Sequence, residues 1–92
     1  MSRRRMMILY SGRVQGVGFR YNAKSAAMGY DVTGTVRNLS DGRVELVAEG
    51  EPAELEPFRQ AVRDSGLGCI IRDEVVTWAP ACGGFRGFEI VS

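Results

Sequence analysis

The sequence has no histidine, only two cysteines and no long hydrophobic run, and each absence excludes a class of protein. Without histidine, and with no CxxC spacing between Cys69 and Cys82, a structural zinc site is not expected. Two cysteines are too few for the disulfide framework of a small secreted domain. The longest apolar run near the start, Met6–Tyr10, is too short for a signal peptide or a membrane span. We therefore expect a cytoplasmic protein that binds no metal and no membrane.

An excess of charge of one sign is also missing, since 12 basic and 11 acidic residues give a net charge of +1. Without Arg3, Arg4 and Arg5, 9 basic and 11 acidic residues remain, which is a net charge of −2. A domain with this balance is not expected to bind nucleic acid. The arginine run could contact RNA or a membrane surface, but chain termini are usually loose. We therefore expect a disordered basic tail at residues 1–5 and one domain at residues 6–92, because 92 residues suit a single core.

The spacing of apolar residues predicts five β-strands, at Met6–Val14, Val32–Asn38, Arg43–Glu49, Cys69–Trp78 and Phe85–Val91. The first strand is apolar on both faces and is therefore expected in the centre of a sheet. Apolar residues from Ala23 to Tyr30 follow helical spacing, which predicts a helix after the first strand. A second helix, Glu51–Ser65, contains Pro57, so it is expected to start late or to bend. The pair Asp41-Gly42 predicts a hairpin between the second and third strands.

This order of elements, β-α-β-β-α-β with a short final strand, is typical of the ferredoxin-like α+β sandwich. In that fold, two helices cover one face of an antiparallel sheet. We expect this architecture for residues 6–92. The fold alone does not define a function, because many activities use it.

The segment Gly12–Arg20 joins the first strand to the first helix and has the properties of an anion-binding loop. Its glycines permit a close backbone approach, and the N–H groups at the start of a helix attract negative charge. Arg20 adds a donor fork that matches two phosphate oxygens. Known nucleotide motifs do not fit, because Tyr21 replaces the last glycine of GxGxxG and the chain has no Gly-Lys pair. The residues alone leave two interpretations open: an anion site, or a glycine-rich connection with a solvated arginine.

Two segments resemble the signatures of a known family. Gly12–Arg20, with the sequence GRVQGVGFR, resembles the first signature of the acylphosphatases. Gly34–Glu45, with the sequence GTVRNLSDGRVE, resembles the second, and Phe85–Ile90 is similar to the last strand of the family. The resemblance runs from about Met7 to Val91 and implies hydrolysis of acyl phosphates to a carboxylate and phosphate.

The resemblance also implies roles for particular residues. Arg20 would bind the phosphoryl group together with the backbone amides of the loop, which are those of Gln15, Gly16, Val17, Gly18, Phe19 and Arg20. Asn38 would position the attacking water; without the resemblance it would be interpreted as a strand-end residue beside the turn. A phosphate or sulfate ion is expected to occupy the same loop. The carboxylate leaving group, whose acid has a pKa of about 4 to 5, needs neither a histidine nor a cofactor to depart.

Two other functions remain as alternatives. An RNA-binding module of the RRM type has the same element order, and Gly84–Val91 loosely resembles its RNP1 motif. That motif belongs on the third strand, however, and Arg43–Glu49 has no aromatic residue. The second alternative is a non-catalytic domain that binds an acyl or carbamoyl phosphate within a larger assembly. We expect a free-standing monomeric enzyme instead, because the chain leaves no room for partner domains.

Overall fold

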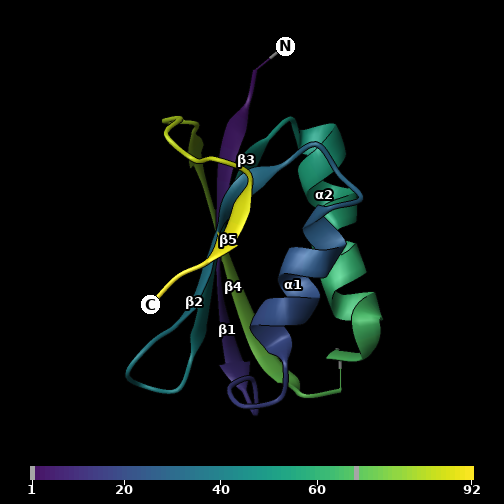
Figure 1. Cartoon of the computed structure of the whole chain (residues 1–92), viewed down its shortest axis with the longest axis vertical. Coiled ribbons are helices and arrows are strands. Elements are labelled where there is room, and N and C mark those ends of the chain that lie inside the picture. The colour runs from purple at the N-terminus through teal and green to yellow at the C-terminus, as the bar shows by residue number, and fades with distance from the viewer. Residues whose placement is uncertain (1, 68) are drawn as a thin grey trace.

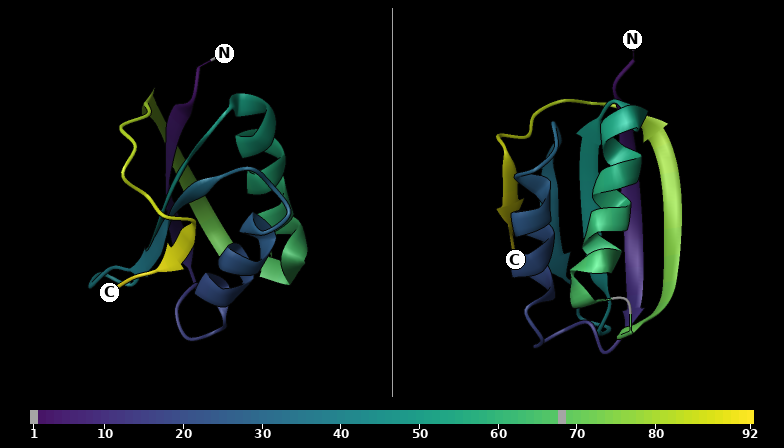
Figure 2. Two further views of the ribbon diagram at one scale, coloured as in Figure 1. Left: turned by 45° about the horizontal axis from the view of Figure 1, so that its top comes forward. Right: turned by 90° about the vertical axis from the view of Figure 1, so that its right-hand side faces the viewer.

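A five-stranded sheet and two α-helices form a two-layer sandwich in which both helices cover the same face of the sheet (Figures 1 and 2). The computed structural model describes residues 2–67 and 69–92. The elements are β1 (Arg4–Gly12), α1 (Phe19–Ala27), β2 (Thr33–Asn38), β3 (Val44–Gly50), α2 (Pro52–Val62), a π-helical turn η1 (Arg63–Leu67), β4 (Ile71–Pro80) and β5 (Phe88–Ile90). The ferredoxin-like α+β prediction is confirmed.

The strands lie in the order β4-β1-β3-β2-β5, so that β1 is buried inside the sheet, as its two apolar faces predict. Pairs among β1 to β4 are antiparallel, whereas β5 runs parallel to β2, with Gly34 opposite Phe88. The sheet is therefore mixed rather than antiparallel throughout. The reason is topological: β4 ends where β2 begins, so a loop that crosses this end enters beside β2 in the same direction (Figure 2).

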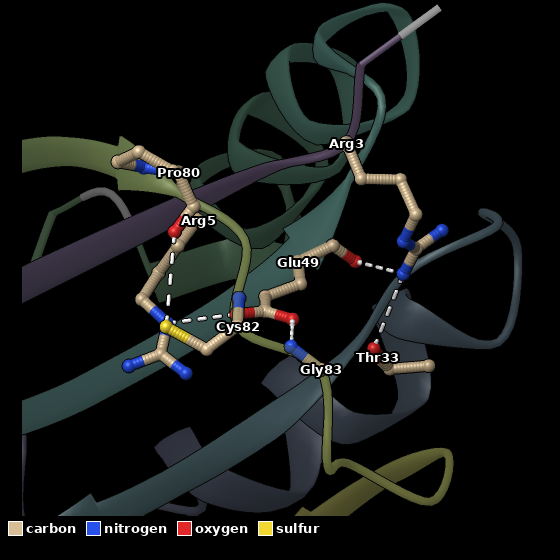
Figure 3. A network of polar contacts seen from close by, with 7 residues as sticks. All are labelled: Arg3, Arg5, Thr33, Glu49, Pro80, Cys82 and Gly83. Atoms are coloured by element: carbon tan, nitrogen blue, oxygen red, sulfur yellow. Dashed lines mark hydrogen bonds and ion pairs between the residues drawn. The ribbon is translucent and has the colours of Figure 1, made fainter.

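The N-terminal segment is more ordered than expected, since β1 begins at Arg4 rather than Met6. Arg5 lies opposite Glu49 of β3, and its Nε is 2.8 Å from Glu49 Oε2. Arg3 donates to the Glu49 carbonyl oxygen at 3.2 Å and to Thr33 Oγ1 at 3.4 Å (Figure 3). Arg4 and Arg5 thus lie within β1, and Arg3 contacts residues of β2 and β3, whereas the division of the chain into a tail at residues 1–5 and a domain at residues 6–92 stays a prediction. Met1 lies outside the described residues.

The Glu49 carboxylate also holds the loop before β5. It accepts hydrogen bonds from the backbone N–H groups of Cys82, at 2.8 Å, and Gly83, at 2.9 Å (Figure 3). Glu49 is 1% exposed, so these bonds replace the water that burial removes. One buried carboxylate therefore joins the first strand, the third strand and the loop that crosses to β5.

The core lies between the helices and the sheet. Phe19, Ala23 and Ala27 form the buried stripe of α1, and their four-residue spacing places them on one face of the helix. The buried stripe of α2 is Leu55, Phe58 and Val62, at three- and four-residue spacing. The strands contribute further core residues, which include Met6, Ile8, Tyr10, Val36 and Leu46. The second helix begins at Pro52 and includes Pro57, so a late start is excluded.

The candidate site lies at one end of the sheet. The contacts of Glu49 lie at the other end. At the candidate site, β1 ends and the loop of residues 13–18 leads into α1, beside the hairpin that joins β2 to β3 (Figure 1). The hairpin is built as predicted: Asp41 Oδ1 accepts the Arg43 N–H at 3.1 Å, and Gly42 has a φ of 95°. Two segments that are distant in the sequence thus share one edge of the molecule.

Candidate active site

The loop between β1 and α1 is anchored at both ends and glycine-rich between its anchors. Val14 and Phe19 are 1% and 2% exposed, and the Phe19 ring lies 4.7 Å from the Tyr10 ring. Between them, Gly16 and Gly18 have φ angles of 76° and 83°, which residues with a Cβ rarely adopt. The glycines therefore permit a sharp turn whose backbone is open to solvent, while the anchors fix its position.

The backbone of this loop offers a cluster of hydrogen-bond donors. Among the described residues, no acceptor receives a bond from the N–H groups of residues 15–20. The first turn of α1 contains no acidic residue, and no side chain caps the helix at Gly18. These donors, together with the positive end of the helix dipole, favour a bound anion.

Arg20 and Asn38 meet at a pocket of about 220 Å³. The pocket is lined by Val14, Gly16, Gly18, Phe19, Arg20, Tyr21 and Asn38. Arg20 projects from the first turn of α1, and within the described part of the chain it forms no ion pair or hydrogen bond. An unpaired guanidinium beside a row of free N–H groups gives the pocket a strong preference for negative charge.

Asn38 is the last residue of β2, opposite Val44 of β3. Its Oδ1 is buried and accepts no hydrogen bond from any described residue. Buried polar atoms in folded proteins nearly always have a partner, so an oxygen without one at the wall of a pocket is suited to bind a donor from a ligand or water. The neutral amide can accept and donate, but it is not a base.

The Gln15 side chain does not face this pocket. Its Nε2 donates to two carbonyl oxygens of the hairpin, that of Leu39 at 2.8 Å and that of Arg43 at 2.9 Å. The side chain thus links the glycine-rich loop to the turn that follows Asn38. No pattern in the sequence indicates this contact, because its two ends are 24 and 28 residues apart.

The structure brings most of the predicted site residues together. Gly16, Gly18, Phe19, Arg20 and Asn38 line one pocket, whereas the other two predicted phosphate-binding residues, Gln15 and Val17, do not. Two lining residues were not predicted, Val14 and Tyr21. Val14 is buried, and Tyr21 is 75% exposed. Their positions directly beside the glycine-rich segment are the only signal that could have found them.

The described residues contain neither a group of three metal-binding side chains nor a membrane-spanning helix. Within residues 2–67 and 69–92, no three histidine, cysteine or acidic side chains are grouped so that they could hold a metal ion. The helices of this part of the chain are all too short or too polar to cross a bilayer.

An α+β sandwich whose first strand-to-helix loop forms a cationic, amide-lined pocket has a site suited to bind an anion. The chain belongs to the acylphosphatase family, since the family model, described as Acylphosphatase, matches residues 6–90. An acylphosphatase of Clostridium acetobutylicum is 40% identical over 95% of this chain and 96% of its own length. One of Salinibacter ruber is 41% identical over 95% and 92%.

Solved structures agree with this assignment. The crystal structure of acylphosphatase from Bacillus subtilis superposes with a TM-score of 0.87 at 38% identity, over 97% of this chain and 99% of that one. Full-length HypF, solved in a phosphate- and nucleotide-bound form, matches with a TM-score of 0.86 at 28% identity, over 98% of this chain but 12% of the HypF chain. A similar domain therefore also occurs inside a much longer protein.

The protein is accordingly an enzyme that hydrolyses acyl phosphates to a carboxylate and inorganic phosphate. These relatives give no support to an RNA-binding module or to a non-catalytic binding domain over this activity. The predicted family and activity are confirmed.

Proposed function

We propose that the pocket between residues 15–20 and the end of β2 is where acyl phosphates are hydrolysed. The amides of the loop and Arg20 hold the phosphoryl oxygens, and Asn38 orients the attacking water. The observation that carries this proposal is the buried Asn38 Oδ1, which lacks a protein partner among the described residues and borders the same pocket as Arg20.

The chemistry suits a site made of fixed donors. In phosphoryl transfer, negative charge spreads over the three equatorial oxygens, so catalysis depends on positioning and on charge stabilisation. Arg20 offers a planar fork to two oxygens, and the loop amides offer donors to the others. Because the Arg20 guanidinium has no carboxylate partner in the described structure, its charge is not compensated before the substrate binds.

The water attacks the phosphorus while Asn38 Oδ1 accepts one of its hydrogens. The new P–O bond forms, the bond between phosphorus and the acyl oxygen breaks, and the carboxylate leaves as an anion. An amide cannot take the proton, so the proton passes to an oxygen of the phosphoryl group, which leaves as dihydrogen phosphate. The good leaving group makes a protein acid unnecessary.

The test is the release of phosphate from benzoyl phosphate by four variants. Arg20→Ala and Arg20→Lys are expected to lose about 10² to 10⁵ in kcat/KM, because a point charge does not replace the fork. Asn38→Ala is expected to lose about 10² or more, and Asn38→Asp is expected to lose activity because a second negative charge repels the phosphoryl group.

Lys24→Ala is the matched control for Arg20. It removes a cation from the same helix one turn further on, and Lys24 does not line the pocket. Its activity is expected to stay within about threefold of the wild type. Turnover like that of the wild type in either Arg20 variant would overturn the assignment of the phosphoryl group to this pocket.

The finer properties of the enzyme follow from the same site. We propose a cytoplasmic monomer that binds phosphate and sulfate in the loop as competitive inhibitors and that does not bind nucleic acid. Inhibition by phosphate should disappear in Arg20→Ala, and light scattering should give the mass of one chain. Retention of an RNA probe at physiological salt would contradict the last point.

A further inference from the structure

The side-chain amide of Gln15 is the direct connection between the phosphate loop and the hairpin that carries Asn38. Its Nε2 donates to Leu39 O at 2.8 Å and to Arg43 O at 2.9 Å. Within the described residues, no other hydrogen bond joins residues 13–20 to residues 38–43. Gln15 is half-buried, so water competes only partly for these bonds.

The hairpin presents its two carbonyl oxygens as a pair. Leu39 N donates to Arg43 O at 2.8 Å, and Gly42 N donates to Leu39 O at 3.2 Å, so the turn is already closed by its own backbone. Each of these oxygens has a second lone pair, and the two N–H bonds of one amide group can reach both. The hairpin can therefore form without the hydrogen bonds from Gln15. It fixes where the hairpin lies relative to the loop.

We infer that Gln15 is a positioning residue for the hydrolysis, which sets the separation between the bound phosphoryl group and the water held by Asn38. Asn38 directly precedes Leu39, so the bond to Leu39 O fixes the backbone next to the water-binding amide. The inference rests on the proposed function, since it assigns the phosphoryl group to the loop and the water to Asn38. The Gln15 side chain contacts neither, because its amide group is bound to the hairpin.

The loop needs such a connection because its other constraints lie at its ends. Val14 and Phe19 are buried, but Gly16 and Gly18 between them leave the backbone free to turn. Without Gln15, the loop and the hairpin would be joined only through the core beneath them. A shift of about 1 Å between nucleophile and phosphorus can reduce the rate about 10²-fold.

The experiment compares Gln15→Leu with the wild type on benzoyl phosphate. The leucine fills similar space but donates no hydrogen bond. We expect kcat to fall about 10- to 100-fold, while KM and the inhibition constant for inorganic phosphate change less than about threefold, because the loop amides and Arg20 remain. The matched control is Gln60→Leu on α2, which removes an exposed bond to Asp64 Oδ1 of 3.0 Å and does not change a residue that lines the pocket. It should keep the wild-type kcat.

A pH profile of Gln15→Glu separates positioning from a merely structural role. The introduced carboxyl can donate one hydrogen bond when protonated and none when ionised, and the two carbonyl oxygens repel the ionised form. The ratio of variant to wild-type kcat should therefore rise as the pH falls. The fold is followed by circular dichroism at each pH, which keeps the test valid if Gln15→Leu folds poorly. A flat ratio in a folded variant would contradict the inference.

A double-mutant cycle with Asn38→Ala completes the test. If Gln15 acts through Asn38, adding Gln15→Leu to Asn38→Ala should cost less than about threefold. Full multiplication of the two effects, or a wild-type kcat in Gln15→Leu, would overturn the inference while Arg20→Ala and Asn38→Ala remain inactive. If those two variants keep their activity, it is instead the proposed function that fails.

Discussion

Arg5 and Glu49 face each other across the β1–β3 ladder, with Arg5 Nε 2.8 Å from Glu49 Oε2. The arginine side chain is 31% exposed and the glutamate 1%, so the pair lies at the edge of the buried interior. The carboxylate also receives two backbone N–H groups from the loop that leads to β5. This one side chain thus ties together three segments at the end of the sheet opposite the candidate site.

Glu49→Gln should destabilise the fold without changing the chemistry. The amide keeps the size of the side chain but loses the charge, and one of its two ends cannot accept a hydrogen bond. Bonds to a charged group contribute about 1.5 to 3 kcal/mol each, so we expect a loss of about 2 kcal/mol or more in the free energy of unfolding. Urea denaturation measures this loss of stability, and the kcat of the folded variant should stay unchanged.

Glu45→Gln on the same strand is the control. Glu45 pairs with Arg37 at 2.9 Å, but the two side chains are 20% and 43% exposed. Solvent screens this pair, so Glu45→Gln should lower the free energy of unfolding much less than Glu49→Gln does. Equal losses in the two variants would show that burial of Glu49 adds nothing.

The Glu49 contacts also predict how stability depends on pH. Burial raises the pKa of Glu49, but the bonds from Cys82, Arg5 and Gly83 outweigh it, and the net pKa lies below the usual value of 4.5. The ionised carboxylate therefore stabilises the fold fully above pH 4.5 or so, and this contribution is lost as the pH falls through the lower pKa of the folded state. The difference in stability between wild type and Glu49→Gln should shrink over this range; a constant difference down to strong acid would contradict the assignment.

The elements that local patterns specify could be predicted from the sequence, whereas contacts between distant segments could not. The Asp41-Gly42 turn was found because its residues dictate the backbone conformation. The end of the chain was predicted less well: β5 covers only Phe88–Ile90, because Gly87, with a φ angle of 67°, interrupts the expected strand. The bonds of Arg5 to Glu49 span 44 residues, and no local signal reports them.

The same distinction applies to the site. The glycine-rich loop and Arg20 are adjacent in the sequence, so their chemistry could be judged together. That Asn38 lies at the same pocket depends on the order of β1, β3 and β2 in the sheet, which the spacing of residues does not specify. The resemblance to a family supplied that relationship before the structure did.

Gly34→Ala should unfold or strongly destabilise the protein. A Cβ at this position would lie 1.9 Å from the Val47 carbonyl oxygen, which is backbone and cannot rotate away. Gly34 also donates to Gly87 O at 2.9 Å, so a shift of β2 would disturb β5 as well. We expect a loss of about 3 kcal/mol or more in the free energy of unfolding, measured by urea denaturation.

Gly29→Ala provides the comparison for this position. The nearest atom to a Cβ there is Ala26 O at 3.6 Å, an ordinary contact. The free energy of unfolding of Gly29→Ala should stay within about 1 kcal/mol of that of the wild type. If Gly34→Ala were as stable as Gly29→Ala, the result would contradict the close backbone contact between β2 and β3 at Gly34.

Gly18→Ala should reduce activity more than stability. A Cβ there meets no atom within 4 Å, but the φ of 83° is costly for any residue other than glycine. The strain is about 1 to 2 kcal/mol, and the loop can relieve it by turning its amides away from the pocket. We expect kcat/KM for benzoyl phosphate to fall at least tenfold. Gly84→Ala, with a φ of 94° and the same open space, should lose similar stability but no activity. Equal activities in the two variants would contradict a role for the loop backbone.

Tyr10→Phe should leave the protein as stable as the wild type or more stable. The Tyr10 hydroxyl is buried and has no hydrogen-bond partner among the described residues. No hydrogen bond therefore offsets the free energy that the hydroxyl loses when it leaves water. Burial, followed by the nearby Glu74 charge, raises the pKa of Tyr10, which keeps the phenol neutral at working pH. Removing the hydroxyl keeps the ring against Phe19, and we expect a gain of up to about 1 kcal/mol in the free energy of unfolding, measured by urea denaturation.

Tyr30→Phe is the control, at a half-buried ring that packs on Phe58, and it should change the free energy of unfolding by less than about 0.5 kcal/mol. A loss of stability in Tyr10→Phe would mean that the hydroxyl has a partner in solution.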